Sequence, residues 1–334
     1  MILIRLPEEK SRPLVFFLAM EEYLAHLPDV HEAFFLWRVD PTVIIGRNQV
    51  LESEVNVPYC KAFGVDIFRR KSGGGCVYAD RGNVMVSYVS DIQDVVSDFE
   101  AFVGKTAEAL RSIGLDAEMS GRNDILVEGV KVSGNAFFKI PGRGIVHGTL
   151  LYDVDFDVLE AAITPSADKM ASKGVKSARA RVANIKDLMA RAGRKPFEDS
   201  LSFMNYLEDY IRAGDEILTL SPEQVLEIET IEQSYLKPRF IYGNTRTLPA
   251  SVERQVSGSG NFCIHLESEF GLITDINLTG DYFPLKEGFE NILSSRLGGC
   301  PLQRHDVQRA LSGIDVGEYI LNMDNEKLLN IIFG

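Results

Sequence analysis

The sequence predicts an α+β protein built from two domains. Short β-rich runs alternate along the chain with amphipathic stretches, and no internal repeat or low-complexity tract interrupts them. The 334 residues exceed one typical domain, and the composition becomes rich in turn-forming residues between Pro238 and Pro249. We therefore expect a first domain over residues 1–245 and a smaller α+β domain over residues 246–334.

The N-terminal elements are an expected helix followed by two short strands. Residues 17–27 carry an apolar face at helical spacing, with charges at Glu21 and Glu22. Residues 34–39 and 42–45 are rich in β-branched and aromatic side chains and are split by an Asp-Pro pair. Because proline cannot donate to a strand ladder, we expect two separate strands.

Two further strands, over residues 65–68 and 84–89, bracket a cluster of three glycines. After them, Ser97 is followed three residues later by Glu100, which is the pattern of a capping box. Apolar side chains then recur at helical spacing until Gly114, a residue that suits a helix C-cap. The sequence thus predicts a helix with its N-cap at Ser97.

The middle of the chain predicts a β-meander, and the C-terminal part predicts a second α+β unit. Residues 124–152 are strand-like, with turn-forming pairs at Glu128-Gly129 and Pro141-Gly142. In the C-terminal part the expected strands are 262–266 and 271–278, and the expected helices are 289–297 and 306–311.

Charge and cysteine content exclude several classes of protein. The formal net charge is −13 and the sequence pI is about 5.0, so the chain has no general attraction for nucleic acids or anionic membranes. No apolar run approaches the roughly 18 residues of a membrane span, and no signal-peptide core is present. The four cysteines form no Cys-x-x-Cys pair. We therefore expect a reduced, cytoplasmic protein.

The strongest chemical signal is the run Arg69-Arg70-Lys71-Ser72-Gly73-Gly74-Gly75. Glycines let backbone N–H groups approach an anion closely, and the cations supply positive charge, so this loop suits a phosphate or an acyl phosphate. The sequence contains no P-loop, no His-Glu-x-x-His and no Gly-x-Ser-x-Gly elbow. The five histidines are scattered, which disfavours a histidine-rich metal site.

Three further positions are candidates for ligand contacts, and each also has a plain structural explanation. Asn83 follows a turn and could donate to a phosphate oxygen or cap the turn. Asp124 opens the meander and could bind Mg²⁺ together with phosphate oxygens, or form an Asx-turn. Strand alternation puts Lys131 and Ser133 on one face, where the lysine would need an anionic ligand unless that face is exposed.

Other features are weaker when taken singly. Residues 164–185 contain five cations and one acidic residue, Asp168, and could bind an anion or form a solvated surface. Trp37 and His147 are most simply core and half-buried residues. Cys76 follows the glycines directly, but no histidine lies close in sequence to act as its base, which favours a small buried residue over a nucleophile.

Together these segments resemble the lipoate–protein ligase A family, in that family's order. The matching segments are residues 36–38, 41–49, 69–83, 123–124, 131–136, 147–151, 172–177 and 280–283. The resemblance implies a mixed β-sheet catalytic domain related to biotin protein ligases and class II aminoacyl-tRNA synthetases, with a small C-terminal accessory domain.

The resemblance also implies a reaction and its partners. ATP and Mg²⁺ would activate lipoate as lipoyl-AMP, and the lipoyl group would pass to a lysine of a carrier domain. The implied carriers are lipoyl domains of 2-oxoacid dehydrogenase acyltransferase subunits and the glycine cleavage carrier protein.

Residue roles follow from the same resemblance. Lys131 is the implied catalytic residue, in contact with the acyl carbonyl and the α-phosphate, and Asp124 is the implied Mg²⁺ partner. Trp37 and His147 would border the lipoyl tail. The remaining implied contacts to lipoate or its adenylate are Arg70, Ser72, Gly73, Gly74, Gly75, Val77, Tyr78, Asn83, Ser133, Gly134, Gly148, Thr149, Lys173, Gly174 and Lys176.

Two other functions fit part of the pattern. One is an ATP-independent lipoyl or octanoyl transferase, but its cysteine-dependent form is disfavoured because no cysteine occurs between Cys76 and Cys263. The other is a non-catalytic lipoate-binding protein, supported only by Ala79, where the family usually has histidine. Retention of residues 173–177 favours adenylate chemistry and therefore the ligase.

Overall fold

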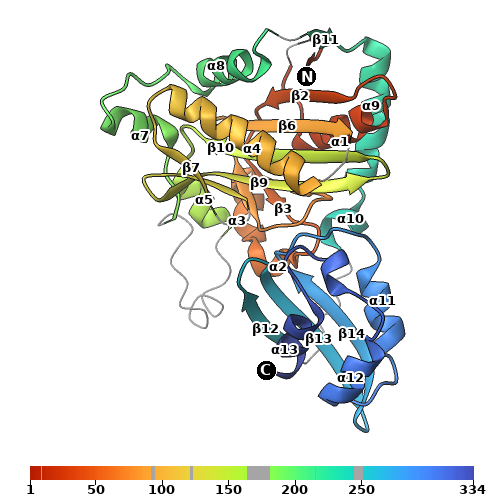
Figure 1. Cartoon of the computed structure of the whole chain (residues 1–334). Helices are drawn as coiled ribbons and strands as arrows, with labels where there is room; N and C mark the ends of the chain where they lie inside the picture. Colours follow the sequence, from red (N-terminus) through yellow and green to blue (C-terminus); the bar gives the residue numbers. More distant parts are fainter. Residues whose placement is uncertain (9, 92–94, 121–122, 164–180, 215, 244–250) are drawn as a thin grey trace. The chain divides into compact units, whose positions relative to one another are not determined.

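The chain divides into two units in the computed structural model (Figure 1). All residues are described except 9, 92–94, 121–122, 164–180, 215 and 244–250. The first unit contains residues 1–45, 51–70 and 76–241, and the second contains residues 46–50, 71–75 and 242–334. The expected linker near residue 245 lies outside the described residues. Two short segments from the N-terminal half, one of which carries the three glycines, pack with the C-terminal part of the chain.

The first unit is organised by an eight-stranded sheet with the order β11-β1-β2-β6-β10-β9-β8-β7. The sheet is mixed, because β1 is parallel to β2 and β11 whereas β2 and β6 to β10 pair in antiparallel fashion. Its strands are β1 (Ile2–Arg5), β2 (Glu32–Trp37), β6 (Asn83–Asp91), β7 (Ala117–Ser120), β8 (Asp124–Val127), β9 (Val130–Ile140), β10 (Arg143–Leu151) and β11 (Ile217–Thr219). A small second sheet has the order β4-β3-β5, from β3 (Thr42–Ile45), β4 (Asp66–Arg69) and β5 (Val77–Ala79).

Helices cover both faces of the large sheet (Figure 1). On one face lies α1 (Leu14–His26), where Phe17 stacks on Trp37 with ring centroids 4.6 Å apart, and α9 (Pro222–Tyr235) packs against α1. On the other face lie α4 (Val95–Ser112) and α8 (Ser200–Arg212). The remaining helices of this unit are α2 (Leu51–Glu54), α3 (Val57–Phe63), α5 (Phe156–Ala162), α7 (Ile185–Arg191) and α10 (Pro238–Tyr242).

The predicted meander is confirmed as β8, β9 and β10, joined at the two expected turns. Glu128 and Gly129 both adopt positive φ, 53° and 74°, as the tight turn between β8 and β9 requires. The predicted N-cap at Ser97 is wrong, because α4 begins at Val95. The Ser-x-x-Glu pattern instead falls inside the helix, where Ser97 and Glu100 are both helical residues.

The second unit is a three-stranded antiparallel sheet with helices packed on it. Its elements are β12 (Ser251–Val256), β13 (Gly260–Glu269), β14 (Leu272–Gly280), α11 (Phe289–Leu297), α12 (Arg304–Ala310), the 3₁₀ helix η2 (Val316–Glu318) and α13 (Asn325–Phe333). Phe262, Leu293, Leu297 and Leu328 are at most 1% exposed and form the centre of its core. The expected helix 289–297 is confirmed with its exact bounds as α11, and the two expected strands and the other expected helix are confirmed to within three residues at each end.

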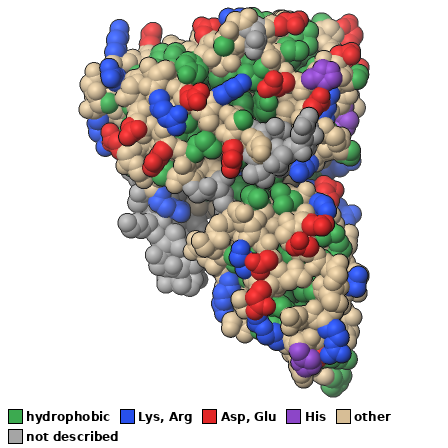
Figure 2. Space-filling model, viewed as in Figure 1, with side chains coloured by type: hydrophobic (Ala, Val, Ile, Leu, Met, Phe, Trp, Pro, Cys, Tyr) green, Lys and Arg blue, Asp and Glu red, His purple; other side chains and the backbone are tan. Residues whose placement is uncertain are grey.

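The surface agrees with the acidic composition. On the face shown in Figure 2, basic side chains are interspersed with acidic ones, and the described residues of that face form no continuous basic surface. Among the described helices, none is long and apolar enough to cross a membrane.

Candidate active site

One face of the large sheet gathers several of the candidate residues. Strand register places Asp124 opposite Gly134, and Gly134 opposite Thr149. His147 lies two residues from Thr149 and therefore points to the same face, which is the face covered by α1. Trp37 on β2 completes the row, since its side chain packs in the same core.

Lys131 reaches this face because β9 carries a bulge. Ile125 pairs with Ser133 but Leu126 pairs with Lys131, so one extra residue, Val132, lies in β9. The ammonium of Lys131 lies 2.7 Å from Asp124 Oδ1 and only 2.9 Å from where a Cβ on Gly134 would sit. A side chain at position 134 would therefore displace the lysine ammonium from its place beside Asp124. The expectation that Lys131 and Ser133 share a face is wrong, since the bulge reverses the alternation.

Asn83 is held by a tight turn that leaves its amide nitrogen available. Its side-chain oxygen accepts a hydrogen bond from the Asp80 N–H at 2.9 Å, and Asp80 Oδ1 accepts from the Gly82 N–H at 2.7 Å. Asn83 is fully buried, and its Nδ2 has no hydrogen-bond partner among the described residues. A buried donor of this kind is costly unless something else satisfies it, so the position fits contact with a ligand oxygen.

Arg70 is a buried cation. Its N–H donates to the Ile45 carbonyl at 3.0 Å and its guanidinium donates to the Ile44 carbonyl at 3.2 Å, which fixes the side chain beside β3. Burial lowers the pKa of Arg70 to about 10, so the group stays charged at neutral pH while its charge is poorly solvated. Such a guanidinium gains from an anionic partner.

Cys76, directly after the glycines, is not a thiolate. Burial raises the pKa of its thiol, and the nearby Glu54 raises it further. The side chain packs against a small core beneath α3 and β3 together with Cys60. A thiol whose pKa is raised is a poor nucleophile at neutral pH, which argues against a covalent role for the partly buried Cys76.

The three adjacent glycines serve different purposes. A Cβ on Gly73 would overlap the Tyr282 carbonyl and lie 2.8 Å from Pro284 Cδ, so this glycine allows a close backbone contact within the second unit. Gly74 adopts φ 86°, and its N–H donates to the Tyr282 carbonyl at 3.2 Å. A Cβ on Gly75 meets nothing within 4 Å. Of the three, only Gly75 has no steric requirement for glycine and no positive φ.

The sequence interpretation missed a buried polar network at the other end of the site. Glu21 is 0% exposed, and its carboxylate accepts hydrogen bonds from Ser87 Oγ at 2.5 Å and from His147 Nδ1 at 2.9 Å. Trp37 Nε1 in turn donates to Ser87 Oγ at 2.9 Å. The sequence feature that could have predicted this network is the acidic pair Glu21-Glu22 in an otherwise apolar helix. Because α1 is buried from Leu14 to Ala25, those charges need internal partners.

Some candidate residues are not brought to this face. Ser133 is buried on the opposite face, where Asn135 Nδ2 donates to its hydroxyl at 3.2 Å. The Asn135 side chain also fills the space above Gly148. Tyr78 lies in the core beneath α3, whereas Val77 packs against the α1 core. Ser72 is buried in the second unit, and its carbonyl accepts from the Arg47 N–H at 3.0 Å. The candidates at positions 173, 174 and 176 lie outside the described residues.

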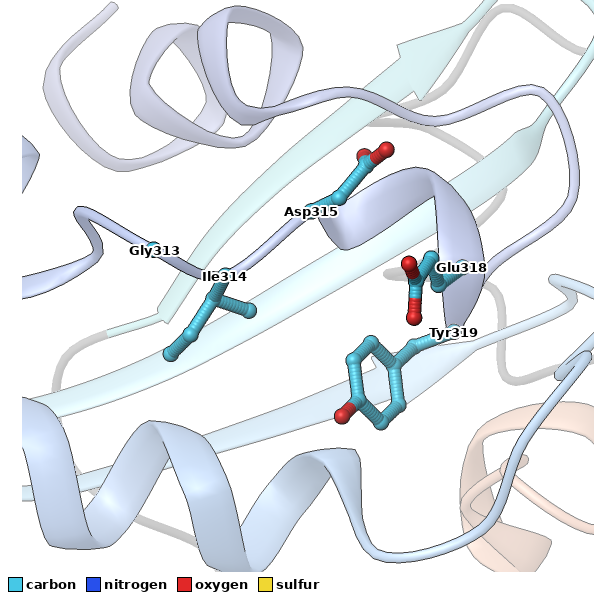
Figure 3. Close-up of a pocket in the computed structure, with 5 residues that line it drawn as sticks. All are labelled: Gly313, Ile314, Asp315, Glu318 and Tyr319. Carbon is cyan, nitrogen blue, oxygen red and sulfur yellow. The ribbon is translucent and has the colours of Figure 1, made fainter.

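A separate hollow of about 360 Å³ lies in the second unit (Figure 3). It is lined by Gly313, Ile314, Asp315, Glu318 and Tyr319, and none of the candidate site residues takes part. The two carboxylates disfavour an anion such as ATP or lipoate, and Glu318 already pairs with Lys286 at 2.5 Å.

Comparison with known protein families accounts for both units. The family described as the lipoyl protein ligase A/B catalytic domain matches residues 13–202. The family described as the bacterial lipoate protein ligase C-terminus matches residues 251–332. The two matches together span most of the chain in the order expected from its motifs.

Individual relatives agree over nearly the whole length. A lipoate–protein ligase of Bacillus subtilis is 33% identical, covering 95% of this chain and 96% of its own, and one of Streptococcus pyogenes is also 33% identical, covering 95% and 94%. Plasmodium falciparum LipL1, solved in complex with lipoate, has the same fold, with a TM-score of 0.74 at 22% identity over 99% of this chain and 97% of its own. A bipartite lipoate protein ligase of Thermoplasma acidophilum, solved in a study with its E2 lipoyl domain, has a TM-score of 0.62 at 27% identity and covers 75% of this chain and 98% of its own. The protein therefore belongs to the lipoyl protein ligase A/B family and carries that family's bacterial C-terminal domain.

Proposed function

We propose that this chain is an ATP-dependent lipoate–protein ligase, which converts lipoate into lipoyl-AMP and transfers the lipoyl group to a lysine of a carrier domain. The observation that carries the proposal is the Lys131–Asp124 pair, held over Gly134 on the sheet face that leads to His147 and Trp37. Relatives named for this activity span 95% of the chain.

The chemistry explains why cations are needed here. A carboxylate does not react with an amine, so lipoate must first form a mixed anhydride with AMP, and this step brings a carboxylate and a triphosphate together. The Lys131 ammonium and the Arg70 guanidinium offset the repulsion and stabilise negative charge that develops at the α-phosphorus. Pyrophosphate leaves, and the carrier amine then attacks the acyl carbonyl and displaces AMP. No protein nucleophile is required, in agreement with the raised pKa of the Cys76 thiol.

The acyl chain fits the face between Lys131 and Trp37. Neighbouring strands are about 4.8 Å apart, so the three steps from β9 to β2 separate the Lys131 end of this face from its Trp37 end. Trp37, Phe17 and His147 supply aromatic walls, while the Glu21 network holds the tryptophan and histidine rings in place. We assign the carboxyl end of lipoate to Lys131 and its dithiolane to the Trp37 end.

We expect Mg²⁺ to bind at this site only together with the phosphate oxygens of the nucleotide. Among the described residues, no group of three His, Cys, Asp or Glu side chains gathers to hold a metal by itself. Asp124 offers one carboxylate, and Mg²⁺ in nucleotide sites needs one or two carboxylates with phosphate oxygens completing its shell. Asp124 is the residue that would hold Mg²⁺ beside the phosphates, where the ion would neutralise charge.

The acceptors are proposed from the family. Members act on lipoyl domain proteins, and the Thermoplasma acidophilum relative was solved in a study with its E2 lipoyl domain. We extend this to lipoyl domains of 2-oxoacid dehydrogenase acyltransferase subunits and to the glycine cleavage carrier protein.

Pyrophosphate release tests the first half of the reaction. The purified chain, ATP·Mg²⁺ and lipoate should release pyrophosphate and form lipoyl-AMP, detected by mass spectrometry, whereas omission of lipoate should abolish the release. Binding of lipoate with no adenylate formed would contradict the proposal and favour a non-catalytic binding protein.

A further inference from the structure

Asn184 occupies the N-cap position of α7, but its side chain does not cap that helix. Asparagine is favoured at N-caps because its side-chain oxygen accepts a hydrogen bond from the first helical turn. Here that oxygen accepts from the Val154 N–H at 2.9 Å, and the amide nitrogen donates to the Val154 carbonyl at 3.1 Å. The carboxamide thus binds both backbone groups of Val154, three residues after the end of β10. The Asn184 side chain is buried, since the residue is only 7% exposed.

The residues before Asn184 support the strand of the catalytic lysine. The Ala183 N–H donates to the Lys131 carbonyl at 3.0 Å, and Val182 forms a parallel bridge with Lys131. This contact falls at the β9 bulge, where pairing with β8 slips by one residue. A bulge locally disrupts the ladder, so Lys131 depends on this second backbone contact for its orientation.

The segment 152–154, which Asn184 binds at Val154, also forms hydrogen bonds to the turn that precedes Asn83. The N–H groups of Tyr152 and Asp153 donate to the Gly82 carbonyl at 3.2 Å and 3.0 Å. The Asp153 backbone lies so close to Gly82 that a Cβ added to Gly82 would overlap the Asp153 carbonyl. Residues 152–154 therefore connect the Asn83 turn, through Asn184, to the Lys131 bulge.

We propose that Asn184 is a positioning residue for Lys131. Its carboxamide fixes residues 182–184 on the end of β10, and this segment fixes the bulge from which the Lys131 ammonium reaches Asp124. The inference rests on the proposed catalytic role of Lys131. A misplacement of about 1 Å in a reacting group can cost roughly 100-fold in rate, so the effect falls on the rate of adenylate formation rather than on substrate binding.

A double-mutant cycle separates positioning from general stability. Single-turnover formation of lipoyl-AMP is measured for the wild type, Asn184→Ala, Lys131→Ala and the double variant. We expect Asn184→Ala to slow this step about 10- to 100-fold with KM for ATP and lipoate within about 3-fold of wild type. The double variant should be no slower than Lys131→Ala, because Asn184 acts through the lysine.

Asn325 provides the matched control in the second unit. Its side chain also accepts from one backbone N–H, of Val316 at 3.0 Å, and donates to one carbonyl, of Ile314 at 2.7 Å. Asn325→Ala should keep the wild-type rate. If Asn184→Ala does not fold, Asn184→Asp is used, since it keeps the acceptor for the Val154 N–H and replaces the donor by a carboxylate oxygen that repels the Val154 carbonyl.

The possible outcomes are distinct. A wild-type rate in the Asn184 variant, an equal loss in Asn325→Ala, or losses that simply multiply in the double variant would each overturn the inference alone. Absence of lipoyl-AMP with the wild-type chain would overturn the proposed function, and the inference with it.

Discussion

The position of the Lys131 ammonium is set by two neighbouring residues, the acidic Asp124 and the side-chain-free Gly134. Asp124 supplies a carboxylate at 2.7 Å, and Gly134 supplies empty space over which the lysine chain lies. Both side chains are about one-third exposed, at 34% and 32%, so the pair is open to a ligand. Asp124 Oδ1 is itself buried and accepts no hydrogen bond among the described residues, so a cation that replaced the ammonium beside it would be stabilised.

Removal of the lysine should abolish most of the activity. We expect Lys131→Ala to lower the rate of lipoyl-AMP formation about 100- to 1,000-fold, because a charge that stabilises the transition state is lost. Lys139→Ala, an exposed position on the same strand, should keep the wild-type rate. A Lys131→Ala rate within about 3-fold of wild type would contradict the assignment. Pyrophosphate release is the measurement.

Glu21 should contribute to stability as well as to the shape of the site. Glu21→Ala leaves Ser87 and His147 without their shared acceptor in a buried place, which should cost about 1–3 kcal/mol of unfolding free energy. Urea denaturation measures this loss. Glu100→Ala on the exposed side of α4 should change the unfolding free energy by less than about 0.5 kcal/mol. An unchanged urea midpoint for Glu21→Ala would show that the network is dispensable.

At the scale of single elements, regular patterns were predictable and interruptions were not. The meander followed from alternation and two turn-forming pairs, and β3 was predicted with its observed bounds. The bulge at Val132 was not predictable, because alternation assumes a regular strand, and this one residue moves Lys131 to the other face. Helix α9 was missed although Ser221 and Gln224 form the capping box that marks its start.

Among the site residues, those in sequence motifs could be predicted and those that depend on burial could not. The motif order predicted Lys131, Asp124 and Asn83 as members of one site, and the last has the orphaned amide that a ligand would satisfy. The network around Glu21 was missed, because an acidic residue in a helix looks solvent-facing until the burial of the whole helix is known. Burial depends on packing between distant segments, which a single sequence does not display.

The glycine loop offers a test at the scale of one element. Gly73→Ala should destabilise the second unit by about 1–3 kcal/mol, because a Cβ there meets the backbone of residues 282–284. Gly75→Ala is the matched control and should leave stability unchanged, since its Cβ would enter open space and its φ is not positive. Thermal unfolding of both variants makes the comparison. Equal stabilities would show that the close contact with Tyr282 is not a constraint.

At the scale of the whole molecule, the unit containing the C-terminal domain also contains part of the glycine motif. The C-terminal domain contacts two earlier segments, residues 46–50 and 71–75. The contacts include the Arg47–Glu287 pair at 2.7 Å and the hydrogen bond from the Gly74 N–H to the Tyr282 carbonyl. The C-terminal domain thus supports the loop whose residues 73–75 were predicted to bind an anion. We nevertheless propose residues 1–245 and 246–334 as the folding domains, because each has its own core.

A fragment experiment tests that division. The fragment 246–334 should unfold cooperatively, because its core around Phe262, Leu293 and Leu328 lies entirely within it. It should be less stable than the same domain in the full chain, since it lacks the contacts of Arg47 and Gly74. Circular dichroism during heating measures both properties. A fragment without a cooperative transition would contradict the proposed boundary.

The most direct test of the central claim is the intact mass of an apo lipoyl domain after incubation with this protein and free lipoate, with and without ATP·Mg²⁺. The account predicts a mass gain of one lipoyl group only when ATP is present. Transfer from an already lipoylated carrier without ATP, together with no reaction of free lipoate under any condition, would contradict it and identify an ATP-independent transferase.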